Sequence, residues 1–201
     1  MTILALLIAG YAAVVLLDSH VGAPFMLERR RVVAWAVYLH LSGGVLAMAL
    51  GPWQFSRKIR SKAITVHRWM GRVYVVAVIC GGIGGLALAT ISEGGMVSHL
   101  GFGLLALLWL GTTIQGYRFI RAKNRVAHKQ WMTRSFALTL AAVTLRIYLP
   151  ITLMAHWPFV PSYQVISWLC WVPNLFVAEW LLRPLTPVPV AAPRPVPTGL
   201  A

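Results

Sequence analysis

Long apolar stretches alternate along this chain with short segments rich in basic residues, proline and glycine. About 20 apolar residues are enough to cross a bilayer as a helix, so this pattern predicts an all-α, polytopic membrane protein. We expect six transmembrane helices, of which the first is short for a span. The predicted helices run from Thr2 to Leu17, Val32 to Trp53, Ile64 to Thr90, Met96 to Tyr117, His128 to the residue before Pro150, and Gln164 to Leu182.

The segments between these helices differ in character. Residues 18–31 predict a polar loop, 57–62 and 118–125 predict basic loops, and Glu93-Gly94-Gly95 predicts a tight turn. Pro173 is expected to kink the last helix. The final segment, 184–201, holds six of the twelve prolines and shows no apolar periodicity. It is predicted to be a disordered tail, which leaves residues 1–183 as a single transmembrane domain.

Two stretches of the chain occur twice. The nine residues from His40 (HLSGGVLAM) match the nine from His99 (HLGFGLLAL) at five positions, 59 residues apart. The motif HRWMGR from His67 returns as HKQWMTR from His128, 61 residues apart. A fixed period indicates an internal repeat, with units at about 34–90 and 93–150. The middle four helices are therefore predicted to form a central four-helix bundle by parallel duplication, about an axis along the membrane normal.

Composition and charge give the expected environment and orientation. The chain is 59% hydrophobic with a formal net charge of +14, and its mean hydropathy is +0.74. Basic residues flank apolar runs, so lipid headgroups are expected as partners and nucleic acid is not. Of the 18 basic residues, 14 fall on side B, the side of the loops after the second and fourth helices. The positive-inside rule makes side B and both termini cytoplasmic, at the bacterial inner membrane, although Arg29, Arg30 and Arg31 lie on the opposite side A.

The four repeated histidines are predicted to form two layers. His40 and His99 lie in the side A halves of their helices, whereas His67 and His128 lie at the side B mouths of theirs. At 1.5 Å per helical residue the layers are roughly 20 Å apart. Symmetry would make equivalent histidines face each other across the bundle axis. This is a geometry that can hold one flat cofactor between two imidazoles in each layer.

Two resemblances extend this interpretation. The motifs HRWMGRVY from His67, GPWQF from Gly51 and HKQWMTR from His128 resemble an uncharacterised bacterial family of predicted membrane proteins, over about residues 38–150. In architecture, though not in motif sequence, the histidine layout resembles the transmembrane di-haem cytochromes b of the ascorbate-reducible and superoxide-oxidising kind. There the second and fourth helices ligate one haem, and the third and fifth ligate the other. This resemblance implies two haem b groups, one held by His40 and His99 and one by His67 and His128.

Nearby cations are suited to the carboxylates of haem. Arg146 is a charge buried within an apolar helix and is expected near the side A layer, where an intramembrane arginine is by default a functional candidate. An iron with two imidazole ligands has no open position and passes electrons. The predicted function is therefore electron transfer with a quinone, superoxide or a soluble partner. The cations expected around the side B pair are Arg68, Arg72, Lys129 and Arg134.

A haem-free protein is the alternative. The repeated histidines would then be packing or proton-relay groups in a small transporter, or in an assembly or lipid-interacting factor, since transporters also arise by duplication. The sequence shows no nucleotide-binding loop, serine nucleophile or cysteine-rich metal motif, and its four acidic residues leave little for acid-base catalysis. Cys80 and Cys170 lie inside apolar runs and are expected to pack, and His20 and His156 are expected at the surface.

Overall fold

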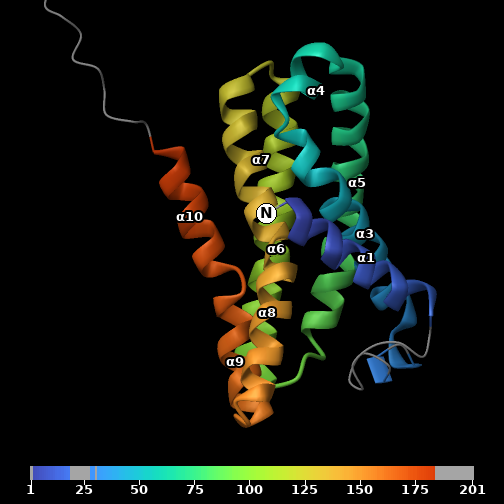
Figure 1. The fold of residues 1–201 in the computed structure, drawn as a ribbon, viewed down its shortest axis with the longest axis vertical. Coiled ribbons are helices and arrows are strands. Elements are labelled where there is room, and N and C mark those ends of the chain that lie inside the picture. The colour runs from blue at the N-terminus through green and yellow to red at the C-terminus, as the bar shows by residue number, and fades with distance from the viewer. Residues whose placement is uncertain (1, 19–27, 30, 184–201) are drawn as a thin grey trace, which may run out of the picture.

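The computed structural model describes residues 2–18, 28–29 and 31–183. The predicted tail, 184–201, and most of the predicted loop at 18–31 lie outside the described residues. Regular structure in the described part is helical throughout (Figure 1). The helices are α1 (Thr2–Leu17), α3 (Ala34–Gln54), α4 (Arg57–Lys62), α5 (Ile64–Ala89), α6 (Gly95–Arg121), α7 (Arg125–Thr139), α8 (Ala141–Met154), α9 (Phe159–Leu169) and α10 (Val172–Leu182).

Five helical segments of the described chain are long and apolar enough to cross a membrane. They are α3, α5, α6, the α7–α8 segment Arg125–Met154 and the α9–α10 segment Phe159–Leu182. The prediction of six spans is not confirmed, because α1 has only 16 residues. Such a helix rises about 24 Å, less than the roughly 30 Å hydrocarbon core of a bilayer. In Figure 1, α1 runs obliquely across the bundle, where it packs on α3 and α8.

Of the two predicted effects of proline on the helices, one is confirmed and one is wrong. The expected kink near Pro173 is confirmed, because α9 ends at Leu169 and Pro173 lies in the first turn of α10. The expected helix end before Pro150 is wrong, because α8 continues through Pro150 to Met154. Transmembrane helices tolerate an internal proline because neighbouring groups can satisfy the backbone carbonyl that it leaves unpaired.

The basic segments are also more ordered than predicted. Residues 57–62 form the short helix α4 and not a loop, consistent with the good helix propensity of arginine and lysine. α6 extends to Arg121 and α7 begins at Arg125, which shortens the predicted loop at 118–125 to a turn. The Asn124 side chain caps α7 by accepting a 3.0 Å hydrogen bond from the Ala127 N–H. Figure 1 shows α4 and this turn at the same end of the molecule, side B.

The helices pack as two antiparallel pairs, α3 with α5 and α6 with α7, and α5 lies beside α6. Glycines allow the first pair to approach closely, since a Cβ on Gly43 would lie 2.4 Å from the carbonyl oxygen of Ala77. α9 packs on α6 and α8, and α10 packs on α7. The centre of the molecule is thus enclosed by α3, α5, α6 and the α7–α8 segment.

Buried hydroxyl groups connect these helices at the centre. The Tyr74 side chain, 1% exposed, hydrogen-bonds the hydroxyls of Ser135 and Thr139, each at 2.9 Å. The indole of Trp109 donates to the Thr139 hydroxyl at 2.9 Å, and the hydroxyls of Thr113 and Ser135 are 2.6 Å apart. Buried polar groups are tolerated only when they are satisfied in this way, and the network connects α5, α6 and α7.

Candidate functional site

A cavity of about 770 Å³ lies inside the bundle, between the hydroxyl network and the side A end. Its wall is contributed by α1, α3, α5, α6, the α7–α8 segment and α9, and most of the lining side chains are apolar. The titratable lining residues are Tyr11, Arg29, His40, Arg146, Tyr163 and Cys170. An apolar cavity with a few convergent polar groups is the usual form of a ligand site.

His40 is held rigidly against the wall of this cavity. Its Nδ1 lies 2.8 Å from the carbonyl oxygen of Gly81 on α5, and because a carbonyl can only accept, Nδ1 is the protonated nitrogen. A Cβ on Gly85 would lie 2.9 Å from the same nitrogen, so the glycine at 85 gives the ring its space. The bond to Gly81 leaves the lone pair of Nε2 available to a ligand.

Arg146 and Arg29 bring positive charge to the cavity. Arg146 donates from Nη1 to the carbonyl oxygen of Ala142 at 3.0 Å, and its guanidinium lies 5.7 Å from the ring centre of Tyr11. It lines the same cavity as His40. Within the described residues, no carboxylate forms an ion pair with Arg146. Arg29, whose side chain is 10% exposed, forms a 3.7 Å ion pair with Glu93.

His99 lies beside the cavity but is not part of its lining. Its Nε2 donates to the carbonyl oxygen of Ser92 at 3.0 Å, and Ser92 itself lines the cavity. The half-buried ring is therefore next to the wall, with the opposite tautomer from His40. The structure shows no contact between His40 and His99, and their predicted pairing stays a prediction.

On side B, His67 and His128 are close enough to interact electrostatically. The Nδ1–H of His128 donates to the carbonyl oxygen of Gly116 on α6 at 2.8 Å, again leaving Nε2 available. The Nδ1 of His67 is buried and has no hydrogen-bond partner. Both histidines lie near the beginnings of their helices, α5 and α7, and their pairing stays a prediction.

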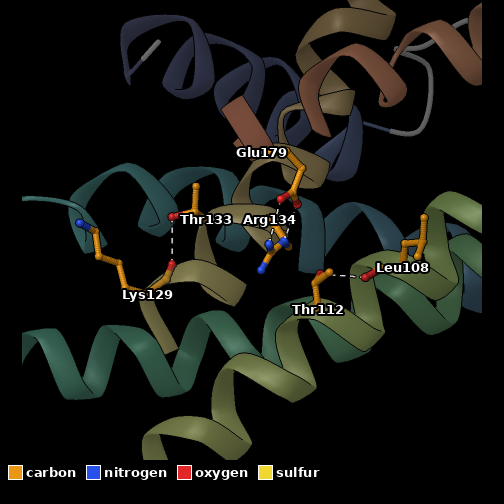
Figure 2. A network of polar contacts seen from close by, with 6 residues as sticks. All are labelled: Leu108, Thr112, Lys129, Thr133, Arg134 and Glu179. Carbon is orange, nitrogen blue, oxygen red and sulfur yellow. Dashed lines mark hydrogen bonds and ion pairs between the residues drawn. The ribbon is translucent and has the colours of Figure 1, made fainter. Parts of the chain in front are cut away.

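The predicted side B cations are arranged in two ways. Arg68, Arg72 and Lys129 are exposed. Arg134 instead forms a two-bond ion pair with Glu179 of α10, with Nη2 at 2.9 Å from Oε2 (Figure 2). That any of these four residues holds a cofactor carboxylate stays a prediction.

The sequence also contains a signal for Glu179, which the prediction did not use. It is an acidic residue inside the last apolar stretch, and an ionisable residue within a span generally has a partner. The sequence places Arg29 only in a loop charge cluster. Its place in the cavity wall, where it pairs with Glu93, depends on contacts between distant parts of the chain, which local sequence does not specify.

The family of predicted membrane proteins known as DUF2306 matches residues 37–182. The chain belongs to this family. The matched region includes all four repeated histidines and Arg146, whereas α1 and Arg29 lie outside it. No curated protein and no solved structure matches the chain. In the described part of this DUF2306 protein, no three His, Cys, Asp or Glu side chains gather as a metal site.

Proposed function

We propose that this DUF2306 protein binds haem b inside the membrane and passes electrons between partners. The observation that carries the proposal is His40, whose ring is fixed by Gly81 and borders a cavity of about 770 Å³ at the centre of the helices. This cavity is large enough for a cofactor, and its lining is mostly apolar. A b-type haem with two imidazole ligands needs histidines at the edge of an apolar pocket.

The tautomers of two histidines support metal ligation. A ligating histidine generally donates its second ring nitrogen to a carbonyl or carboxylate, which fixes the ring and makes the ligating nitrogen more basic. His40 and His128 both do this through Nδ1, to Gly81 and Gly116 respectively, each at 2.8 Å. His67 lies near His128 and has a buried nitrogen without a protein partner.

The charges around the cavity also fit haem, which carries two carboxylates. Arg146 and Arg29 both line the cavity, and the first has no ion-pair partner within the described chain. A charge buried without a partner is costly, so an anionic ligand at Arg146 would stabilise the folded protein. The fit at His99 is incomplete, because this ring would have to release the Ser92 carbonyl before it could face His40.

The local geometry of the two motifs supports the duplication on which the two-layer proposal rests. Arg72 lies 4.9 Å over the ring of Trp69, and its counterpart Arg134 lies 4.9 Å over the ring of Trp131. The Tyr74 and Ser135 hydroxyls meet at 2.9 Å, which joins α5 of the first unit to α7 of the second.

Haem iron with two imidazole ligands supplies one-electron transfer. The chain contributes the imidazoles that bind it, the arginines that hold its carboxylates, and an apolar wall that excludes water. With one site in each half of the membrane, electrons could pass between a quinone or soluble partner and an acceptor on the opposite side. We propose that side B, which carries most of the basic residues, is the cytoplasmic side, with both termini there.

Counting haem in the purified protein tests this proposal. The protein should be produced in cells supplied with a haem precursor and purified in mild detergent. Its haem is then measured as the pyridine complex, and the haem concentration is divided by the protein concentration. We expect two haem b groups per chain. Protein that is folded, as judged by its helical circular dichroism, but lacks haem both as purified and after incubation with ferrous haem would contradict the proposal.

A haem-free binding function is the second candidate. The bond from His99 to Ser92 favours it, because this ring is already satisfied and lies outside the cavity lining. The cavity would then take an amphipathic molecule with an anionic or carbonyl head at Arg146 and an apolar body, as expected for a transporter or lipid-interacting factor. Organic extraction of colourless purified protein, followed by mass spectrometry, would identify such a ligand.

A further inference from the structure

A second hollow lies on the outer surface of the α3–α5 pair, away from the central cavity. This hollow, the α3–α5 groove, has a volume of about 340 Å³. Its lining includes Leu46, Trp69, Arg72, Val73, Val76 and Cys80. Five of its ten lining residues are exposed, and both helices are apolar enough to span a membrane, so the groove would face lipid.

The corresponding surface of the second repeat unit is covered by α9 and α10. Ser42 lines the groove, and its counterpart Gly101 is so close to α9 that an added Cβ would lie 2.5 Å from the Ser167 hydroxyl. Arg72 lines the groove, and its counterpart Arg134 is paired with Glu179 of α10 (Figure 2). The α3–α5 groove is therefore the uncovered equivalent of a surface that elsewhere carries a helix with a carboxylate.

Arg72 lacks the anion that its counterpart has. It lies eight residues into α5, about 12 Å along the helix, and its guanidinium stacks on Trp69 at 4.9 Å. No carboxylate of the described chain forms an ion pair with it. An arginine at this depth favours a charged partner, because the surrounding medium screens its charge poorly.

We propose that the α3–α5 groove binds an anionic phospholipid, with its phosphate at Arg72 and an acyl chain along Val73, Val76 and Cys80. Guanidinium groups bind phosphate oxygens through paired charge-assisted hydrogen bonds. The basic helix α4 and the exposed Arg68 precede Arg72 in the chain and add positive charge at the same end of the molecule. This proposal does not require haem, and it assigns Arg72 to lipid in place of the haem carboxylate that the sequence analysis gave it.

Charge argues for a lipid over a second copy of this chain. The sequence has only four acidic residues, and two of them, Glu93 and Glu179, are already paired with arginines. A copy therefore has little acid to offer, and its net charge of +14 would repel another. Anionic lipids are attracted to basic segments next to a membrane.

Native mass spectrometry of the full-length protein, with added phosphatidylglycerol or phosphatidylcholine, tests the site. We expect phosphatidylglycerol to bind preferentially, and Arg72→Gln to weaken its binding about tenfold, as expected for losing a charge-assisted contact. Arg134→Gln is the matched control, because the carboxylate of Glu179 already occupies that position. Inorganic phosphate alone should not displace the lipid, because it lacks the acyl chain.

Quenching of Trp69 fluorescence locates the bound lipid. Phosphatidylglycerol brominated on its acyl chains should quench the wild-type protein more than brominated phosphatidylcholine does, and Trp69→Phe should remove this difference. Equal lipid binding by wild type and Arg72→Gln would overturn the proposal. So would a membrane protein retained at the groove in stoichiometric amount and released by Arg72→Gln, since the occupant would then be a helix.

Discussion

The two ends of the helical bundle present their histidines differently. On side A, His40 is anchored through Gly81 and borders a cavity of about 770 Å³, while His99 stays bonded to Ser92 outside the lining. On side B, His67 and His128 lie near each other, but neither ring lines that cavity. Side A thus has a cavity with one imidazole at its edge, and side B has two histidines near the beginnings of α5 and α7. For His40 and His99 to share one ligand, the His99 ring would have to release the Ser92 carbonyl.

The largest expected effect is that of removing His40. His40→Ala should lower the haem content from two groups to about one per chain, because it removes the anchored ligand and leaves the iron with an open position. His99→Ala should remove the same centre. The pyridine complex gives the count, and His156→Ala, at an exposed turn, is the control. If His40→Ala and His99→Ala each still bind two haem groups, neither residue ligates haem.

Removing either histidine of the side B pair should likewise remove one haem, but from the other centre. His67→Ala and His128→Ala should each remove one haem and spare the one that His40→Ala removes. Double variants sharpen the comparison, since His67→Ala with His128→Ala should retain one haem, whereas His40→Ala with His128→Ala should retain none. Arg125→Ala, an exposed residue near His128 that is not among the predicted haem-binding cations, serves as the control. If His40→Ala and His67→Ala remove the same haem, the ligands pair within one repeat unit.

Arg146→Gln should produce a smaller change, confined to side A. Loss of a positive charge near the iron disfavours the reduced state, so the midpoint potential of that centre should fall. The expected fall is tens of millivolts, because a unit charge acting through an effective dielectric constant of about 20 contributes on the order of 1 kcal/mol at such separations. A redox titration followed by absorbance measures it, with Arg68→Gln, which is exposed, as the control. A rise in potential would contradict the placement of Arg146.

Tyr74→Phe should have the smallest effect on haem binding, because Tyr74 lies between the two histidine layers. It removes the hydroxyl that bonds Ser135 and Thr139, at a cost of about 1–3 kcal/mol of stability for partners left unsatisfied in the core. The melting temperature in detergent should fall while the haem content stays unchanged. Tyr117→Phe, on the exposed surface, should melt like the wild type. If Tyr74→Phe loses one haem, Tyr74 belongs to a haem-binding site.

The positions of the long helices could be predicted from the local sequence, whereas the residues at which helices end could be predicted less well. Apolar runs of 20 or more residues have few stable alternatives in a membrane, so α3, α5 and α6 could be located within a few residues. The end of α8 could not, because whether a helix continues through Pro150 depends on the groups around it. The first predicted span is not confirmed, since Thr2–Leu17 has the composition of a transmembrane helix without its length.

Only part of the candidate site could be predicted from the sequence. The repeat singles out His40 and an apolar context singles out Arg146, and both border the cavity, whereas His99 lies outside its lining. The cavity depends on how α1, α9 and the Arg29 side chain pack against the bundle, and no local pattern encodes that packing. Arg29 also accounts in part for the basic charge on side A, because it is buried against Glu93 and is not a free loop charge.

The most direct test of the central claim is the difference spectrum of the purified protein, reduced minus oxidised, recorded before and after adding carbon monoxide. If two imidazoles ligate each haem, sharp bands of a b-type cytochrome should appear, and carbon monoxide should leave them unchanged because no axial position is open. A spectrum without bands would contradict haem binding altogether. Bands that carbon monoxide shifts would contradict the pairing of His40 with His99 or of His67 with His128.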